Sequence, residues 1–182
     1  MHWLTLRQWS AALVIGALAV TAPAIRSTSQ ETQPPSDIRA TIEGTWELIE
    51  WHVDGVIVTP PEMEGRWMVH DGFVMAIRHR DGPESFVSTA GYGEYVWGPM
   101  TWTYGYERSE DLAGTTSADP VTLSVTGANP IPMRTFDIRR EGSHLLLEQR
   151  GGGLTWDYDM PRNTFLLMAA DGTTIRKYRR VR

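Results

Sequence analysis

The chain alternates between short segments rich in Val, Ile, Thr, Trp and Tyr and turn signals placed at close intervals. Asp-Gly pairs begin at Asp54, Asp71, Asp81 and Asp171, and Gly151 opens a run of three glycines. Asp-Gly between apolar runs is a strong hairpin signal, because both central residues of the turn need a positive φ. Beyond residue 38, no long stretch repeats apolar residues at helical spacing. The pattern predicts an all-β, antiparallel protein of about eight to ten strands, either a barrel or a sandwich.

The segments with strand character are 45–53, 56–59, 66–70, 73–80, 91–97, 100–107, 121–126, 133–140, 144–150, 154–160, 164–168 and 174–181. Residues 109–120 and 127–132 are the longest irregular pieces. On a barrel they would lie at the mouth and gate it, or they would be plain connections between strands.

Alternation within these segments indicates which side chains share a face. One strand presents an aromatic face made of Met100, Trp102, Tyr104 and Tyr106. The strand before it, 73–80, presents one face made of Phe73, Met75, Ile77 and His79. Its other face is partly apolar too, and we expect the face with Phe73 and Met75 to point inward.

The N-terminus has the pattern of a secretory signal. Residues 1–10 carry one cation, Arg7, and no acid, and residues 11–20 are uninterruptedly apolar and end before Ala22-Pro23-Ala24. This apolar run is shorter than the roughly 20 residues that a bilayer span needs. We therefore expect cleavage after Ala24, export to the periplasm or beyond, and no integral membrane span afterwards. Residues 25–37 are polar and predict a disordered tether, which leaves 38–182 as the folded domain.

The composition excludes several classes of binding site and catalytic group. The chain has 17 Lys+Arg, 22 Asp+Glu and a formal net charge of −5, so a nucleic-acid surface is not expected. It has no Cys, which excludes disulfides, cysteine metal centres and a thiol nucleophile. Four histidines follow the signal, and their spacing matches no metal motif. The sequence predicts no metal and no other cofactor.

One motif points to a family. Gly44-Thr45-Trp46 opens the first strand, and the last strand is basic, from Arg176 to Arg180. Together with the meander of strands and the export signal, this resembles the lipocalin-like (calycin-type) barrels of bacteria over residues 42–181. The resemblance implies an up-and-down barrel in which the Trp46 indole plugs the floor. It also implies that a cation of the last strand, Arg176 or Arg179, packs across the indole, a contact that cation–π attraction favours.

The leading hypothesis for function is an exported barrel that binds a small hydrophobic or aromatic molecule. The expected ligand-binding residues are Trp46, Phe73, Met75, Tyr92, Trp102, Tyr104, Tyr106 and Phe136.

An enzyme is the main alternative, a cofactor-free cyclase or isomerase that encloses a lipophilic substrate and polarises it. The catalytic candidates are Glu50, His52, Glu94 and Tyr104. Strand parity with Trp46 sends Glu50 and His52 inward, whereas a position at the rim beside the turn at Asp54 would leave both in solvent.

A β-sandwich of carbohydrate-binding type, with exposed tryptophans, is a third hypothesis. Parity places Trp51 and Trp97 opposite the expected inner face, and outward aromatics of this kind would suit a homodimer.

Overall fold

A computed structural model describes residues 34–83 and 85–181. These residues form one short helix followed by twelve strands of a single sheet. The helix is α1 (Ser36–Ile42), and the strands are β1 (Gly44–Val53), β2 (Val56–Val58), β3 (Met63–His70), β4 (Phe73–Asp81), β5 (Phe86–Gly98), β6 (Thr101–Gly114), β7 (Thr122–Gly127), β8 (Arg134–Glu141), β9 (His144–Gln149), β10 (Leu154–Asp159), β11 (Thr164–Ala169) and β12 (Thr174–Arg180).

The sheet closes on itself because β1 pairs with both β3 and the last strand, β12. The ring runs β1-β3-β4-β5-β6-β8-β9-β10-β11-β12 and returns to β1, so ten antiparallel strands form the barrel. Strands β2 and β7 lie outside this ring and pair with β1 and β6. The predicted all-β, up-and-down barrel is confirmed, and closure around the first strand excludes the β-sandwich.

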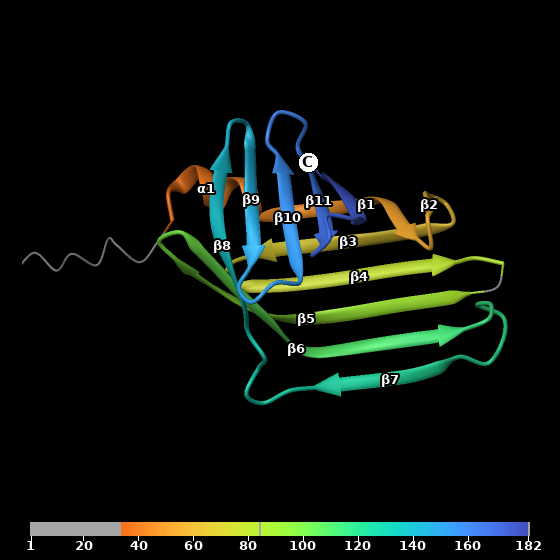
Figure 1. Cartoon of the computed structure of the whole chain (residues 1–182). Coiled ribbons are helices and arrows are strands. Elements are labelled where there is room, and N and C mark those ends of the chain that lie inside the picture. The colour runs from red at the N-terminus through yellow and green to blue at the C-terminus, as the bar shows by residue number, and fades with distance from the viewer. Residues whose placement is uncertain (1–33, 84, 182) are drawn as a thin grey trace, which may run out of the picture.

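The strands of the barrel run in two directions. In Figure 1, β3 to β7 lie side by side, and β8 to β11 cross their direction. Strands β5 and β6 have 13 and 14 residues, whereas β9, β10 and β11 have 6 each. The longer strands therefore extend past the shorter ones, at the end of the molecule away from α1 (Figure 1).

Two Asp-Gly turns form the expected hairpins. Asp54 and Gly55 join β1 to β2 with φ of 51° and 79°, and Asp71 and Gly72 join β3 to β4 with φ of 48° and 87°. In both turns the two central residues lie in the left-handed region, which the tight hairpin turn requires and which Asp and Gly tolerate best.

The first half of the predicted loop 109–120 is strand. Residues 109–114 continue β6, where they pair with β5, and residues 109–113 also pair with β7. The sequence there, Ser109-Glu110-Asp111-Leu112-Ala113-Gly114, is polar and poor in β-formers. It is extended because two neighbouring strands supply its backbone hydrogen bonds, which is a tertiary effect that local propensity does not report.

Helix α1 closes one end of the barrel. Its side chains Ile38 and Ile42 are buried in the main core, and the Ile42 carbonyl accepts a hydrogen bond from the Trp46 indole Nε1 at 3.2 Å. The helix begins at Ser36, so the last two residues of the predicted tether, 36 and 37, are helical. Residues 25–33 of that tether lie outside the described residues, as does the predicted signal, residues 1–24.

Trp46 lies in the floor of the barrel as expected, but the cation that packs on it is not one of the two expected arginines. Trp46 is buried, and the Arg180 guanidinium lies 4.6 Å from its ring centroid. Arg180 pairs with Trp46 in register and faces the same side, whereas Arg179 faces outward and bonds to Glu47. The expectation of Arg176 or Arg179 as the cap is therefore wrong: alternation turns Arg179 outward, and Arg176 faces inward but lies against Trp51 instead of Trp46. The Arg180 Nη2 donates to three carbonyls at the end of α1, those of Ala40, Thr41 and Glu43.

Gly44 is needed at this floor for two reasons. Its φ is +143°, in a region that L-residues rarely adopt, and a Cβ there would approach Arg180 Nη1 to 3.3 Å. Any side chain at residue 44 would thus both strain the backbone and press on the cation that covers Trp46.

Aromatic side chains fill the barrel from the floor to its middle. Trp102 lies at the centre of this group and is completely buried. Its ring neighbours are Trp67, Tyr95, Trp97, Tyr104, Phe136 and Trp156. Such ring pairs contribute about 0.5–1.5 kcal/mol each beyond the area they bury. The chain has no Cys and cannot form disulfides, so packing of this core takes their place in stabilising the fold.

Among the described residues, no helix is long and apolar enough to cross a bilayer.

Candidate functional site

A cavity of about 340 Å³ lies beyond the aromatic core, on the side away from the floor. Its volume falls at the lower end of the range of roughly 300–1,000 Å³ found for small-molecule sites. The lining comes from both crossing halves of the barrel and consists of Trp67, Arg78, Tyr104, Tyr106, Arg134, Leu154, Trp156, Leu167, Ile175, Arg176 and Tyr178.

Alternation along the strands explains why polar side chains point into the cavity. On β4, Arg78 follows the buried Val74 and Ala76 at every second position, so its stem continues the inner face. On β12, Arg176 and Tyr178 share one face in the same way. The Arg134 side chain enters at the start of β8 and is exposed, which places it at the rim.

The cavity holds an excess of positive charge. Three guanidiniums, those of Arg78, Arg134 and Arg176, belong to the lining, and no carboxylate does. Within the described part of the chain, none of the three forms an ion pair with an acid, although most other arginines do. Local charge here is opposite in sign to the formal net charge of −5.

Several buried hydrogen-bond donors of the cavity have no partner in the described chain. They are the Nε atoms of Arg78 and Arg176 and the indole Nε1 atoms of Trp67 and Trp156. A buried donor without an acceptor costs about 1–3 kcal/mol, so native structures seldom leave four of them together. All four groups are donors, and a negatively charged acceptor would satisfy them.

The surroundings shift the pKa values of the lining groups. Burial, with a smaller contribution from the nearby Arg78 cation, lowers the pKa of Arg176 to about 10, so its guanidinium is still charged at neutral pH. Burial raises the pKa values of Tyr104, Tyr106 and Tyr178, against the opposing effect of the arginines. These three phenols therefore stay protonated and remain able to donate hydrogen bonds at physiological pH.

An aromatic ring holds Arg176 in place. Its Cζ lies 4.8 Å from the ring centroid of Trp51, and the Cζ of Arg80 lies 5.7 Å from the same ring. A guanidinium stacks flat on an indole while its hydrogens stay free to bond elsewhere. This stack orients the cation toward the cavity without neutralising it.

The structure separates the predicted ligand-binding residues into three groups. Tyr104 and Tyr106 line the cavity, as expected. Trp46, Trp102 and Phe136 are fully buried in the floor and core and do not line it. The remaining three, Phe73, Met75 and Tyr92, lie on the outer face of the sheet, 64%, 40% and 45% exposed.

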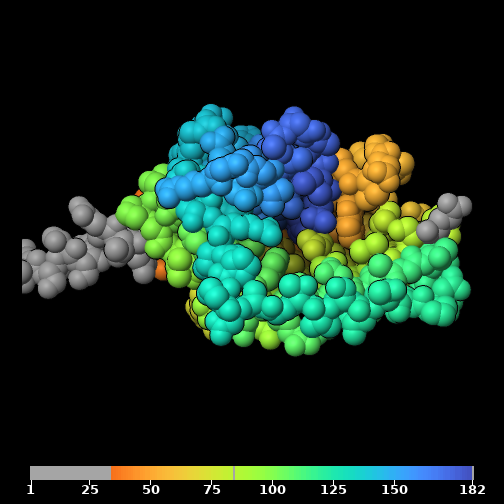
Figure 2. All heavy atoms as spheres, turned by 60° about the horizontal axis from the view of Figure 1, so that its bottom comes forward, coloured from red at the N-terminus to blue at the C-terminus, as the bar shows by residue number. Residues whose placement is uncertain are grey.

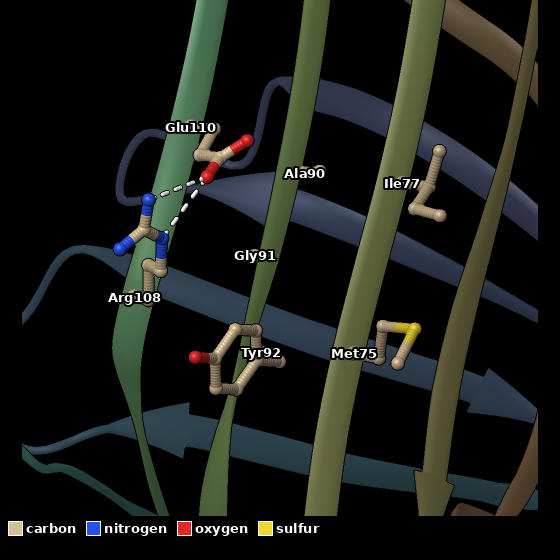
Figure 3. A pocket seen from close by; sticks show the side chains of 7 residues that line it. All are labelled: Met75, Ile77, Ala90, Gly91, Tyr92, Arg108 and Glu110. Atoms are coloured by element: carbon tan, nitrogen blue, oxygen red, sulfur yellow. Dashed lines mark hydrogen bonds and ion pairs between the residues drawn. The ribbon is translucent and has the colours of Figure 1, made fainter. Parts of the chain in front are cut away.

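Met75 and Tyr92 line a groove on β4, β5 and β6 (Figure 3), and Phe73 lines a neighbouring hollow together with them. Met75 faces Tyr92 across the strand pair, and Arg108 at the groove's edge forms an ion pair with Glu110 at 2.8 Å. The groove is open to solvent on the outside of the barrel. It therefore offers a ligand the outer surface of the sheet and not the inside of the ring of strands.

The expectation that Phe73 and Met75 point inward on β4 is wrong, because Val74 and Ala76 form the inner face. Ala76 pairs with Trp67, which in turn pairs with Trp46, and Gly91 pairs with Ala76 on the far side. Two indoles and two small residues thus share one row across four strands. The barrel has room for both indoles only because the small side of β4 faces them, and the bulkier Phe73 and Met75 are turned outward.

A β-bulge in β1 moves two of the proposed catalytic residues out of the barrel. Pairing with β12 shifts between Leu48 and Glu50, and the extra residue reverses the alternation, so that Trp51 is buried in the core. Glu50 bonds to the outward-facing Lys177 at 2.8 Å and to His52 at 3.1 Å. The hydrogen bond from Lys177 outweighs partial burial and lowers the pKa of Glu50. The pair lies on the outside rather than in the cavity.

The other acid candidate is also outside. Glu94 is exposed and pairs with Phe73 on the outer side of the sheet. Of the four catalytic candidates, Tyr104 alone lines the cavity, so the structure does not bring an acid or histidine to it. The geometry offers binding groups rather than a general acid and base.

Sequence reasoning missed Arg78, Arg134, Trp67 and Trp156 as site residues. A signal was present in β4 and β12, where arginines alternate in step with buried side chains, as Arg78 does with Ala76. Three inward cations on strands far apart in the chain cannot be recognised as one group until the barrel closes.

The described residues contain no group of three or more His, Asp or Glu side chains arranged to hold a metal ion. No family model, curated protein or solved structure matches the chain.

Proposed function

We propose that this protein is an exported, lipocalin-like barrel that binds a small organic anion with an apolar or aromatic body in its interior cavity. The observation that carries the proposal is the group of three guanidiniums with no facing carboxylate. Guanidinium bonds in a bidentate way to carboxylate or phosphate oxygens, and such charge-assisted bonds are about twice as strong as neutral ones.

The rest of the lining suits the body of such a molecule. Trp67, Trp156, Leu167 and Ile175 supply apolar surface beside the cations. The three phenols donate further hydrogen bonds to an anionic group without adding negative charge. Apolar surface beside converging polar groups is what small-molecule sites have in common, and the polar share of this cavity is large, as an anionic ligand requires.

Matched acid and neutral ligands test the proposal. Pairs such as laurate with lauryl alcohol, and naphthoate with naphthalene methanol, would be titrated against intrinsic tryptophan fluorescence, because Trp67 and Trp156 line the cavity. We expect each acid to bind at least about 10-fold more tightly than its neutral partner, since a lost charged hydrogen bond costs about 1.5–3 kcal/mol. Equal binding of acid and neutral partner, or binding of neither, would overturn the proposal.

Two matched variants locate the binding. Arg176→Met removes a cavity cation, and we expect it to weaken acid binding at least about 10-fold while sparing the neutral ligand. Arg179→Met removes an outward cation of the same strand, bonded to Glu47, and should leave acid binding unchanged. If both variants weakened binding equally, overall charge and not the cavity would be responsible.

A further inference from the structure

Strand β7 presents a free edge. It pairs with β6 through residues 122–127, and no other described strand pairs with it. All six of its residues are exposed. In Figure 1 it is the last strand of the sheet on its side, and Figure 2, turned to bring that side forward, shows this part of the chain at the surface.

This edge lacks the features that keep edge strands unpaired. Its sequence, Thr122-Leu123-Ser124-Val125-Thr126-Gly127, has no charged residue and no proline. Natural edge strands are protected by lysine, proline, a bulge or very short length. The other strand outside the ring, β2, has three residues and is protected by length, whereas β7 has six.

The sequence of β7 is nearly symmetric about its centre. Thr122 and Thr126 flank Leu123 and Val125, which flank Ser124. If two copies pair in antiparallel fashion about Ser124, Leu123 of one faces Val125 of the other, and Thr122 faces Thr126. Each of these contacts occurs twice, once on either side of the axis, as a two-fold interface requires.

Two apolar side chains project from β7 on the outer face of this edge. Leu123 and Val125 are 57% and 47% exposed, with Leu112 of β6 directly opposite Leu123 and Glu110 opposite Val125. In the two-fold arrangement, Leu112 and Leu123 of one copy and Val125 of the other would lie in one row across the paired strands. The paired edges would therefore satisfy unpaired backbone groups and shield part of this apolar row at once.

We propose that β7 joins two copies of this chain edge to edge, antiparallel, with the two-fold axis at Ser124. The two β3–β7 faces become one continuous sheet, and each interior cavity stays separate. The proposal is independent of what the cavity binds.

Single-cysteine variants test the register, because the chain has no Cys of its own. At the axis, Ser124→Cys places two thiols on directly opposed residues, whose Cα atoms lie about 4.5–5.5 Å apart, within the span of a disulfide. In Thr122→Cys and Thr126→Cys the thiols are offset by four residues, about 14 Å along the strand, and cannot meet. All three positions are exposed, so random collisions would give all three a chance to cross-link.

Each variant would be oxidised mildly at micromolar concentration and followed by non-reducing gel electrophoresis. We expect Ser124→Cys to form the covalent dimer at least about 10-fold faster than either control, and the Thr122→Cys/Thr126→Cys double variant to cross-link as well. Equal slow cross-linking of all three single variants would overturn the proposal, as would faster cross-linking at residue 122 or 126.

Light scattering over a concentration series gives a second readout without cysteine. Ser124→Lys brings two ammonium groups face to face at the axis and should weaken the dimer at least about 10-fold, with the circular dichroism spectrum unchanged. A wild-type chain that stays monomeric up to millimolar concentration would refute the pairing, including the case in which β7 instead takes up a strand from another protein.

Discussion

Replacing Arg176 by methionine should stabilise the protein in the absence of ligand. The Arg176 guanidinium is surrounded by Tyr178, Tyr106 and Arg78 and has no carboxylate beside it. Burying a cation without a counter-charge is unfavourable. The chain nevertheless retains this unfavourable group at the cavity, as the anion binding proposed above would require.

The magnitude follows from the effect of burial on the guanidinium. A pKa lowered from 12.5 to about 10 corresponds to about 3.5 kcal/mol, since one pKa unit is worth about 1.4 kcal/mol. Stacking on Trp51 offsets about 1 kcal/mol of this, and that contact is lost in the variant. Methionine has a similar length and keeps most of the packing. We therefore expect a net gain of about 2–3 kcal/mol.

The assay is urea unfolding at pH 7 without ligand, followed by circular dichroism. Arg179→Met is the control, because that side chain is exposed and faces outward, and it should change stability by less than about 0.5 kcal/mol. A loss of more than about 1 kcal/mol in Arg176→Met would refute the reasoning, since it would mean that Arg176 is held by stabilising contacts and is not an uncompensated cation.

Three further predictions concern stability. Trp46→Ala should cost about 3–5 kcal/mol in urea unfolding, because the indole is fully buried in the floor, and a loss below about 1 kcal/mol would contradict that role. Glu43→Ala should cost about 1–3 kcal/mol because it removes the acceptor, at 2.8 Å, of the buried Tyr95 hydroxyl; in a Tyr95→Phe background the cost should fall. A hydrogen bond to Asp157 raises the pKa of His144, so the stability difference between wild type and His144→Asn should be largest below about pH 6.5 and disappear as pH rises through the folded pKa. An unfolding series from pH 5 to 9 measures it, and a difference that grows with pH would contradict this.

In the first strand, alternation predicts the inward-facing side chains correctly up to Leu48 and wrongly after it. From Trp46 to Leu48, period-two spacing gives the inner face correctly. One extra residue before Glu50 then reverses it, and the buried residue becomes Trp51. Nothing in the local sequence marks that bulge, because it arises from the register between β1 and β12, two strands at opposite ends of the domain.

The fourth strand shows a different limit. Both of its faces are partly apolar, so the spacing of Phe73, Met75 and Ile77 could not decide which face is inside. Steric fit decided it, because Trp67 and Trp46 occupy the same row and leave space only for a residue as small as Ala76.

The sequence by itself determined most of the strands and most of the turns. These depend on neighbours within a few residues: β-branched and aromatic runs form strands, and Asp-Gly pairs adopt the positive φ that hairpins need. The place of Trp46 in the floor followed from the family resemblance. The tertiary structure decided the inner faces of β4 and of β1 beyond Leu48, and with them the site. Arg78, Arg134 and Arg176 come from three strands far apart in the chain, and only closure of the barrel brings their charges together without a counter-ion.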